Sequence, residues 1–135
     1  MSRGLSFSYK QIDSRLRPII PIELEHTGKF GYEVLVDSGA DICIFHADIG
    51  RAIGLVIEDG ELFELGGITG TKRIGYFHKI TLRIGGVSYR TKVGFTDNMR
   101  DDAYGMVGQK GFFDRFAIKF DYAERRLILH KKKWT

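Results

Sequence analysis

The sequence predicts a mainly β domain that is largely antiparallel and of barrel or sandwich type. Along most of the chain, apolar and polar residues alternate with a period of two, as they do in strands that bury one face. Helical spacing occurs in only two short stretches. The length of 135 residues, with only two prolines and no repeat or low-complexity run, predicts one domain with one hydrophobic core.

Short turns separate the strands that this alternation predicts. In chain order, the expected strands cover residues 20–24, 30–36, 80–84, 87–95, 118–122 and 127–129. Thr27-Gly28 suits the turn between the first two strands. Gly85-Gly86 lies between the two central strands and is a strong signal for a tight hairpin.

Two short helices are expected to pack on the sheet and close the core. The first covers residues 47–53, where apolar residues recur at helical spacing and Gly54 is placed to end the helix. The second follows Gly111, where Phe112, Phe113 and Phe116 have helical spacing.

Composition disfavours several classes of function. Basic residues outnumber acidic ones by 21 to 17, and much of the surplus lies in Lys131-Lys132-Lys133, which favours a solubilising tail or a salt-sensitive contact over nucleic-acid binding. The single Cys43 predicts a buried thiol in a reducing compartment. The first ten residues have no apolar signal segment and no stretch has membrane length, so we expect a cytoplasmic protein with no membrane partner. Scattered histidines without companion cysteines predict no metal site.

One acidic residue directly follows an apolar strand. Val34-Leu35-Val36 leads into Asp37-Ser38-Gly39, and a carboxylate is costly to desolvate unless it is paired or used. Two carboxyls that share a proton can activate a water molecule, one as general base and the other as donor to a carbonyl under attack. No other acid of the chain has the same flanking residues, so a catalytic Asp37 requires a second chain related by a twofold axis.

Residues 37–39, Cys43 and residues 65–71 each suit other structures or chemistry, which sequence spacing helps to distinguish. Asp37-Ser38-Gly39 also suits an ordinary turn. Ser38 lacks the earlier glycine of a nucleophile elbow, and Cys43 between two isoleucines is a poor thiolate. Residues 65–71 are rich in glycine but lack P-loop spacing, so they predict either a mobile hairpin tip or an ordinary exposed turn.

Three segments in this order resemble the single-domain, retropepsin-like aspartic proteases, the group that contains the retroviral proteases. They are DSGAD at 37–41, GGITG at 66–70 and MVGQKGFF at 106–113. The resemblance extends from about Arg17 to His130 and depends on order and spacing together. It implies a closed β-barrel with one or two short helices, one domain per chain, and an active site that a homodimer completes.

The resemblance also implies roles for individual residues. Asp37 would be the catalytic aspartate, contributed once by each subunit, and the Ser38 hydroxyl would brace the two active-site loops. Gly39 would let the substrate backbone approach, and Met106-Val107-Gly108 would pack beneath the active-site loop. Substrate binding is implied for Gly39, Ala40, Asp41 and the flap residues Gly66, Gly67, Ile68, Thr69 and Gly70.

Two positions depart from the retroviral pattern. Retroviral relatives commonly have arginine after the last glycine of the third segment, paired with the acid at the Asp41 position, whereas this chain has Gln109. That pair is therefore lost or replaced, for instance through Lys110. The flap has Thr69 where a retroviral flap has glycine, and a β-branched residue resists positive φ.

We therefore expect an aspartic endopeptidase that hydrolyses a polypeptide substrate as a homodimer, with no metal and no cofactor. The expected division is an N-terminal extension at 1–16, whose flexibility the sequence leaves open, a protease domain at 17–130 and a basic tail at 131–135. Two alternatives are a catalytically silent dimer of the same fold that binds peptides or proteins, and a basic β-barrel that binds nucleic acid.

Overall fold

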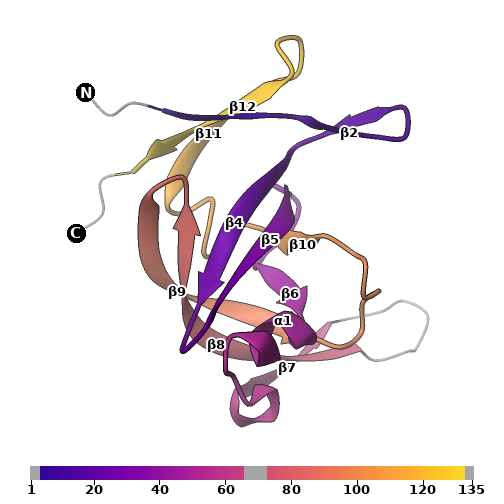
Figure 1. Cartoon of the computed structure of the whole chain (residues 1–135), viewed down its shortest axis with the longest axis vertical. Helices are drawn as coiled ribbons and strands as arrows, with labels where there is room; N and C mark the ends of the chain where they lie inside the picture. Colours follow the sequence, from indigo (N-terminus) through magenta and orange to yellow (C-terminus); the bar gives the residue numbers. More distant parts are fainter. Residues whose placement is uncertain (1–3, 66–72, 133–135) are drawn as a thin grey trace.

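A closed barrel of six strands lies at the centre of the molecule (Figure 1). The computed structural model describes residues 4–65 and 73–132 of the chain. Around the barrel the strands follow the order β4 (Ile19–Glu25), β5 (Lys29–Val36), β10 (Gly105–Val107), β6 (Ile44–His46), β9 (Val87–Thr96) and β8 (Arg73–Ile84). Antiparallel pairing of β4 with β8, in which Leu24 lies opposite Leu82, closes the ring. The predicted mainly β fold and closed barrel are confirmed.

The remaining elements pack around this barrel. β7 (Glu61–Leu65) pairs with β8 as an outer strand. A separate three-stranded sheet, at the top of Figure 1, contains β1 (Leu5–Ser8), β12 (Arg126–Lys131) and β11 (Phe116–Asp121). A hairpin of β2 (Lys10–Ile12) and β3 (Arg15–Arg17) connects this sheet to β4, and α1 (Ala47–Ala52) and the short 3₁₀ helix η1 (Ile57–Asp59) follow β6.

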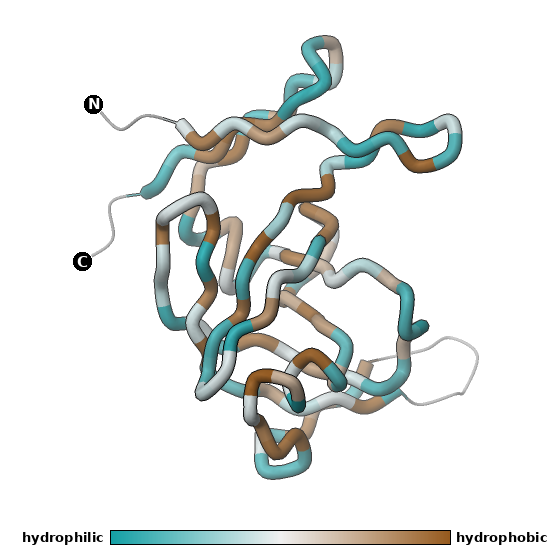
Figure 2. The backbone as a smooth tube through the Cα atoms, viewed as in Figure 1, coloured by the Kyte–Doolittle hydropathy of each residue, from teal (hydrophilic) through white to brown (hydrophobic). Residues whose placement is uncertain are grey.

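The barrel strands form where apolar and polar residues alternate, as the colours of Figure 2 show along β4. Ile20, Ile22 and Leu24 are buried, whereas Pro21 between them is exposed and Glu23 is half-buried. Successive side chains of a strand point to opposite faces, so this alternation selects the face that turns to the core. The strands predicted from alternation are present, several of them longer than predicted.

The turn between β8 and β9 has the geometry that its sequence predicts. Gly85 and Gly86 have φ angles of 53° and 92°. A two-residue hairpin turn with positive φ at both central positions matches the twist of its strands, and glycine adopts such angles at little steric cost. The strong hairpin signal in the centre of the chain is therefore confirmed.

Aromatic side chains fill the core. The rings of Phe45 on β6 and Phe95 on β9 are fully buried with centroids 5.9 Å apart. Phe116 on β11 lies 5.2 Å from Phe112 and 5.9 Å from Tyr89 on β9, centroid to centroid. Burying one phenylalanine side chain contributes about 1.5–3 kcal/mol to folding. One continuous core therefore joins the barrel to the three-stranded sheet.

The first predicted helix forms and the second does not. α1 begins after His46 and is followed by Gly54, whose φ of 98° ends the turn. After Gly111, residues 111–115 form hydrogen-bonded turns instead of a helix, and β11 begins at Phe116. The helical spacing is satisfied by a single turn in which the Phe116 N–H donates to the Phe112 carbonyl at 3.1 Å. Forming the first turn of a helix is unfavourable, and this segment is too short to offset that cost because β11 begins directly after it.

Part of the expected N-terminal extension consists of strands. β1 lies antiparallel to β12, with Phe7 opposite Leu127. The division into extension, protease domain and basic tail itself stays a prediction. Within residues 4–65 and 73–132, no helix combines the length and the apolar character that crossing a bilayer requires.

Candidate active site

Asp37 directly follows the buried strand β5. Val34 and Val36 are buried in the core, so Leu35 and then Asp37 alternate toward the other face of the strand. β5 pairs in parallel with β10, and the Asp37 N–H continues this ladder by donating to the Val107 carbonyl at 3.0 Å. The main chain on both sides of β5 therefore determines where the carboxylate lies.

The turn after β5 orients the Asp37 side chain. Its Oδ1 accepts a hydrogen bond from the Gly39 N–H at 2.9 Å, and its carbonyl accepts one from the Ala40 N–H at 3.2 Å. An aspartate that bonds the main chain two residues later forms an Asx turn, which limits rotation of the carboxylate. Oδ2 has no hydrogen bond within the part of the chain that the structure describes, so it is the oxygen that remains available.

The segment after β10 braces this turn through Gln109 and Lys110. The Gln109 N–H donates to the Ala40 carbonyl at 2.8 Å, and the Lys110 N–H donates to the Asp41 carbonyl at 3.0 Å. Gly108 makes the approach possible, because a Cβ there would lie 2.4 Å from the Ala40 carbonyl oxygen. The Asp37 turn is thus held mainly through main-chain bonds.

Gln109 takes a different role from the arginine of the retroviral pattern. Its Nε2 donates to the Ser38 carbonyl at 2.5 Å in the same chain. Asp41 is exposed and forms no ion pair within residues 4–65 and 73–132. Of the two outcomes that the sequence left open, loss of the retroviral-type pair or its replacement through Lys110, the described chain shows no replacement, and Gln109 supports the Asp37 turn instead.

A cavity of about 480 Å³ opens beside this turn. Ala40 and Asp41 form one end of it, and Ile44, Phe63 and Met106 contribute apolar walls. A concave, mostly apolar surface with a few polar groups at its edge is the usual form of a ligand site. The cavity can therefore bury an apolar side chain of a ligand next to the Asp37 turn.

Two more cavities adjoin the first through Met106. One of about 290 Å³ shares Ile44, Leu65 and Met106 with it, and one of about 430 Å³ lies on the other side of Met106, against Leu35 and Arg17. The strand register explains this arrangement, because Met106 on β10 lies between Leu35 on β5 and Ile44 on β6. Leu35, Met106 and Ile44 thus form a row of apolar residues across three neighbouring strands. Leu35, at one end of the row, lies two residues before Asp37.

The predicted flap tip at Gly66, Gly67, Ile68, Thr69 and Gly70 lies outside the described residues. Its two arms are present, because β7 and β8 pair antiparallel up to Leu65 opposite Arg73. Leu65, the last described residue before the tip, lines two of the cavities. This end of β7 therefore borders the same cavity as Ala40 and Asp41. The substrate-binding roles predicted for the tip stay predictions.

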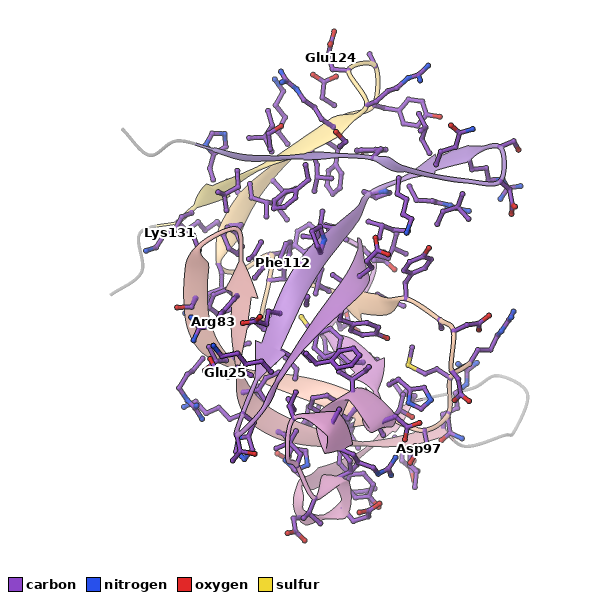
Figure 3. The ribbon with its side chains drawn as sticks, viewed as in Figure 1. Glu25, Arg83, Asp97, Phe112, Glu124 and Lys131 are labelled. Atoms are coloured by element: carbon purple, nitrogen blue, oxygen red, sulfur yellow. The ribbon has the colours of Figure 1, made fainter. Side chains whose placement is uncertain are left out.

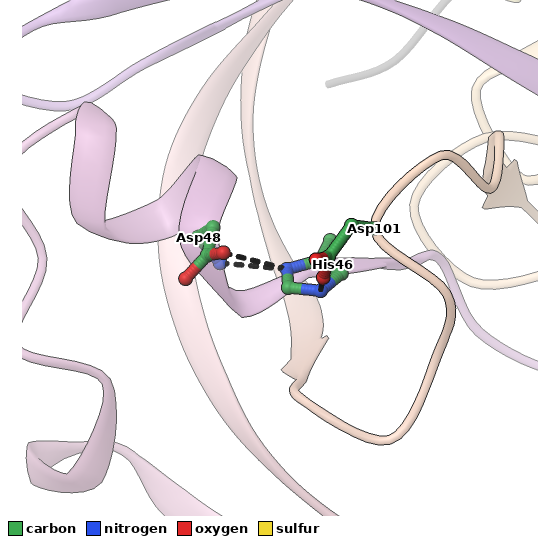
Figure 4. Close-up of side chains that lie close together, drawn as sticks. All are labelled: His46, Asp48 and Asp101. Carbon is green, nitrogen blue, oxygen red and sulfur yellow. Dashed lines mark hydrogen bonds and ion pairs between the residues drawn. The ribbon is translucent and has the colours of Figure 1, made fainter.

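A buried histidine close to this hollow was missed by the sequence analysis (Figure 4). His46, at 6% exposure, caps α1 by accepting the Asp48 N–H on Nδ1 at 3.0 Å, while its Nε2 lies 2.9 Å from Oδ1 of Asp101. One side-chain oxygen from each aspartate and one ring nitrogen of His46 lie within 4.8 Å of one another. A metal ion bound to Nδ1 of His46 would have to displace the Asp48 N–H that caps α1. Hydrogen bonds therefore account for the closeness of His46, Asp48 and Asp101. The only signal in the sequence is a histidine two residues before an aspartate at a helix start.

Cys43, Asp97 and Arg51 have shifted pKa values. Burial raises the pKa of Cys43 to about 12, so its thiol stays protonated at neutral pH and is a poor nucleophile. A bidentate hydrogen bond from Arg51, at 2.9 and 2.8 Å, lowers the pKa of Asp97 and raises that of Arg51. This exposed ion pair joins α1 to the residue that follows β9.

No protein-family profile and no curated protein sequence match the chain. Solved structures do match it. A retropepsin-like aspartic protease from Rickettsia conorii superposes with a TM-score of 0.68 at 14% identity, covering 97% of each chain. EIAV protease, in complex with the inhibitor HBY-793, superposes with a TM-score of 0.51 at 18% identity, covering 73% of this chain and 88% of that one.

The chain has the retropepsin-like fold. The predicted resemblance is thereby confirmed at the level of the fold. At these identities the likeness concerns the arrangement of the backbone, while activity has to be argued from the residues themselves. In this barrel Asp41 and Met106 line one cavity, and Asp41 belongs to the turn that begins at Asp37.

Proposed function

We propose that this protein is an aspartic endopeptidase whose active site forms from two copies of the chain. The observation that carries the proposal is the Asp37 turn, in which the Gly39 N–H holds one carboxylate oxygen and the next residues, Ala40 and Asp41, form one end of an apolar cavity. Two solved structures with this fold are named as proteases, which supports the same reaction class.

The proposed chemistry needs two carboxyl groups that share one proton. Like charges at close range cannot both ionise easily, so one carboxyl stays protonated while the other is charged. The charged Asp37 removes a proton from water as it attacks the peptide carbonyl, and the protonated Asp37 of the second copy donates to the carbonyl oxygen. The tetrahedral intermediate then collapses: the leaving nitrogen takes the proton that the first Asp37 removed from water, and the second Asp37 takes a hydroxyl proton back from the intermediate. The chemistry needs no metal and no cofactor.

A twofold homodimer supplies the second carboxyl in the right place. A twofold axis presents the same surface of both copies, so an Asp37 turn lying on the axis meets its own copy. The polypeptide substrate lies extended across the axis, with its side chains in the cavities around Met106. Ser38, Gly39, Ala40 and Asp41 support the loop and contact the substrate main chain, and residues 66–70 cover it.

The decisive test compares Asp37→Asn with the wild type. Asparagine keeps the size of the side chain and can still accept from Gly39, but it cannot act as the base. We expect cleavage of unfolded casein to fall by at least about a thousandfold, while sedimentation shows an unchanged dimer. Pepstatin should inhibit the wild type. Full activity of the variant, or a wild type that stays monomeric at the concentrations at which it cleaves, would refute the proposal.

A dimer of the same fold that binds peptides without cleaving them is the second candidate. Gln109, which stands where the retroviral pattern has arginine, favours it because the cation expected beside Asp41 is missing from this position. In that case casein peptides bind equally well to the wild type and Asp37→Asn, and neither produces fragments.

A further inference from the structure

The loop between β9 and β10, residues 97–104, is anchored to four separate elements. Asp97 pairs with Arg51 on α1, and the Asn98 side chain accepts from the Ile74 N–H on β8 at 3.1 Å. Asp101 bonds His46, and the Ala103 carbonyl accepts from the Tyr32 hydroxyl on β5 at 3.1 Å. The loop is thus ordered by bonds to other elements rather than by secondary structure of its own.

The anchor at Asp101 differs from the other three because it lies in the middle of the loop. Between Asn98 and Ala103, the side chain of Asp101 is the only one that bonds another element within the described chain, since Arg100 pairs with Asp102 in the loop itself. The Asp101 side chain is 93% exposed, yet its acceptor oxygen reaches an imidazole that is 7% exposed. An exposed carboxylate is thereby tied to a rigid part of the fold.

The hydrogen-bond geometry determines which nitrogen of His46 carries the proton. Nδ1 accepts the Asp48 N–H, so in the neutral ring the hydrogen is on Nε2 and points to Asp101 (Figure 4). The bond at 2.9 Å therefore joins an N–H donor to a charged acceptor, which is stronger than a bond between neutral groups. Breaking it releases the middle of the loop and leaves the cap of α1 in place.

The loop lines both of the cavities that adjoin the first one through Met106. Asn98 and Met99 line the cavity of about 290 Å³ next to Leu65. Arg100 and Asp102 line the cavity of about 430 Å³ on the other side. Tyr104, at the end of the loop, lines both. The position of the loop therefore determines the shape of both cavities.

We propose that Asp101 and His46 form a clasp that positions residues 97–104 as the wall between two side-chain cavities, so that Asp101 is a positioning residue for ligand selection. The ligand is a polypeptide whose neighbouring side chains enter the two cavities. The ligand part rests on the proposed function, whereas the clasp itself is a property of the fold.

Asp101→Ala and Asp101→Asn test the clasp, with Glu124→Ala as matched control. Asp101 is exposed, so its replacement leaves the core intact, and the amide oxygen of asparagine can still accept from Nε2. Glu124 is an exposed acid in the turn between β11 and β12, far from this loop (Figure 3). In Asp101→Ala we expect amide hydrogen exchange over residues 98–103 to accelerate by about tenfold or more. Asp101→Asn and Glu124→Ala should exchange like the wild type.

The second measurement addresses ligand selection with casein-derived peptides. Asp101→Ala should raise KM roughly three- to tenfold while kcat stays within about twofold, because binding and not the chemical step is affected. Asp101→Asn should restore the wild-type KM. Unchanged exchange and KM in Asp101→Ala, or an asparagine variant as impaired as the alanine variant, would overturn the clasp.

The two proposals can fail separately. If the wild type cleaves no casein peptide, the proposed function fails, and exchange still decides whether the clasp orders the loop. The affinity of the same peptides for Asp37→Asn then replaces KM, and an affinity that Asp101→Ala leaves unchanged in that background overturns the ligand part.

Discussion

Two loops border the cavities around Met106, and they are held in place by different kinds of bond. The Asp37 turn, residues 37–41, is held chiefly by main-chain hydrogen bonds from Gln109 and Lys110 on the segment that follows β10. The loop at 97–104 is held chiefly by hydrogen bonds and ion pairs that involve side chains and join it to four elements. Main-chain hydrogen bonds persist as long as the two backbones stay close, whatever the side chains are. A bond made by a side chain is lost when that one residue is replaced. The first loop should therefore resist most substitutions, and the second should loosen without unfolding of the protein.

Gly108→Ala is expected to have the largest effect on the main-chain brace. The added Cβ would lie 2.4 Å from the Ala40 carbonyl oxygen and 2.6 Å from that of Ile42, so the two segments must separate. We expect a loss of about 3 kcal/mol of unfolding free energy, measured by urea denaturation. Gly31→Ala is the matched control, because no atom lies within 4 Å of its added Cβ. Equal urea midpoints for the two variants would contradict a close main-chain contact at Gly108.

Gln109→Ala should have an intermediate effect on the free energy of unfolding. It removes only the one side-chain bond among those that hold the Asp37 turn. The change removes the donor to the Ser38 carbonyl and leaves the main-chain bonds in place. We expect a loss of about 1 kcal/mol in thermal or urea unfolding, with a lower kcat/KM for casein peptides. Gln11→Ala removes another exposed glutamine far along the chain and should change neither. A Gln109→Ala protein as unstable as Gly108→Ala would mean that the side chain carries the brace.

Arg51→Ala should have the smallest effect and concerns the side-chain brace of 97–104. The ion pair with Asp97 is exposed, so the expected loss at neutral pH is less than about 1 kcal/mol. Because Arg51 lowers the pKa of Asp97 in the folded state, its stabilisation is present above the unfolded-state pKa of about 4 and is lost as pH falls through the folded-state value.

The measurement for Arg51→Ala is the unfolding free energy at several pH values between 7 and about 2. The difference between wild type and variant should shrink as pH falls below about 4. Arg126→Ala, at an exposed arginine without an ion pair in the described part of the chain, should show a difference that does not change with pH. A difference for Arg51→Ala that stays constant to low pH would exclude Asp97 as its partner.

The contrast between the two loops also explains how far sequence analysis could reach. Asp37, Gly39 and Gly108 are recognisable because strand alternation, turn residues and the order of three short segments are all local patterns. The strands and the tight turn at Gly85-Gly86 follow from the same short-range rules. His46 has no such signal, because its partner Asp101 lies on a distant loop. The helix expected after Gly111 failed because β11 begins at Phe116, which the spacing of phenylalanines does not reveal.

By itself the sequence determined the strands, the hairpin turn and the turn that carries Asp37, because side-chain alternation and backbone sterics act over a few residues. Only the tertiary structure decided that Gln109 would reach the Ser38 carbonyl, 71 residues earlier, and that His46 would hold Asp101. Those contacts depend on β10 lying between β5 and β6, and strand order within a barrel is set by long-range packing that no local pattern encodes.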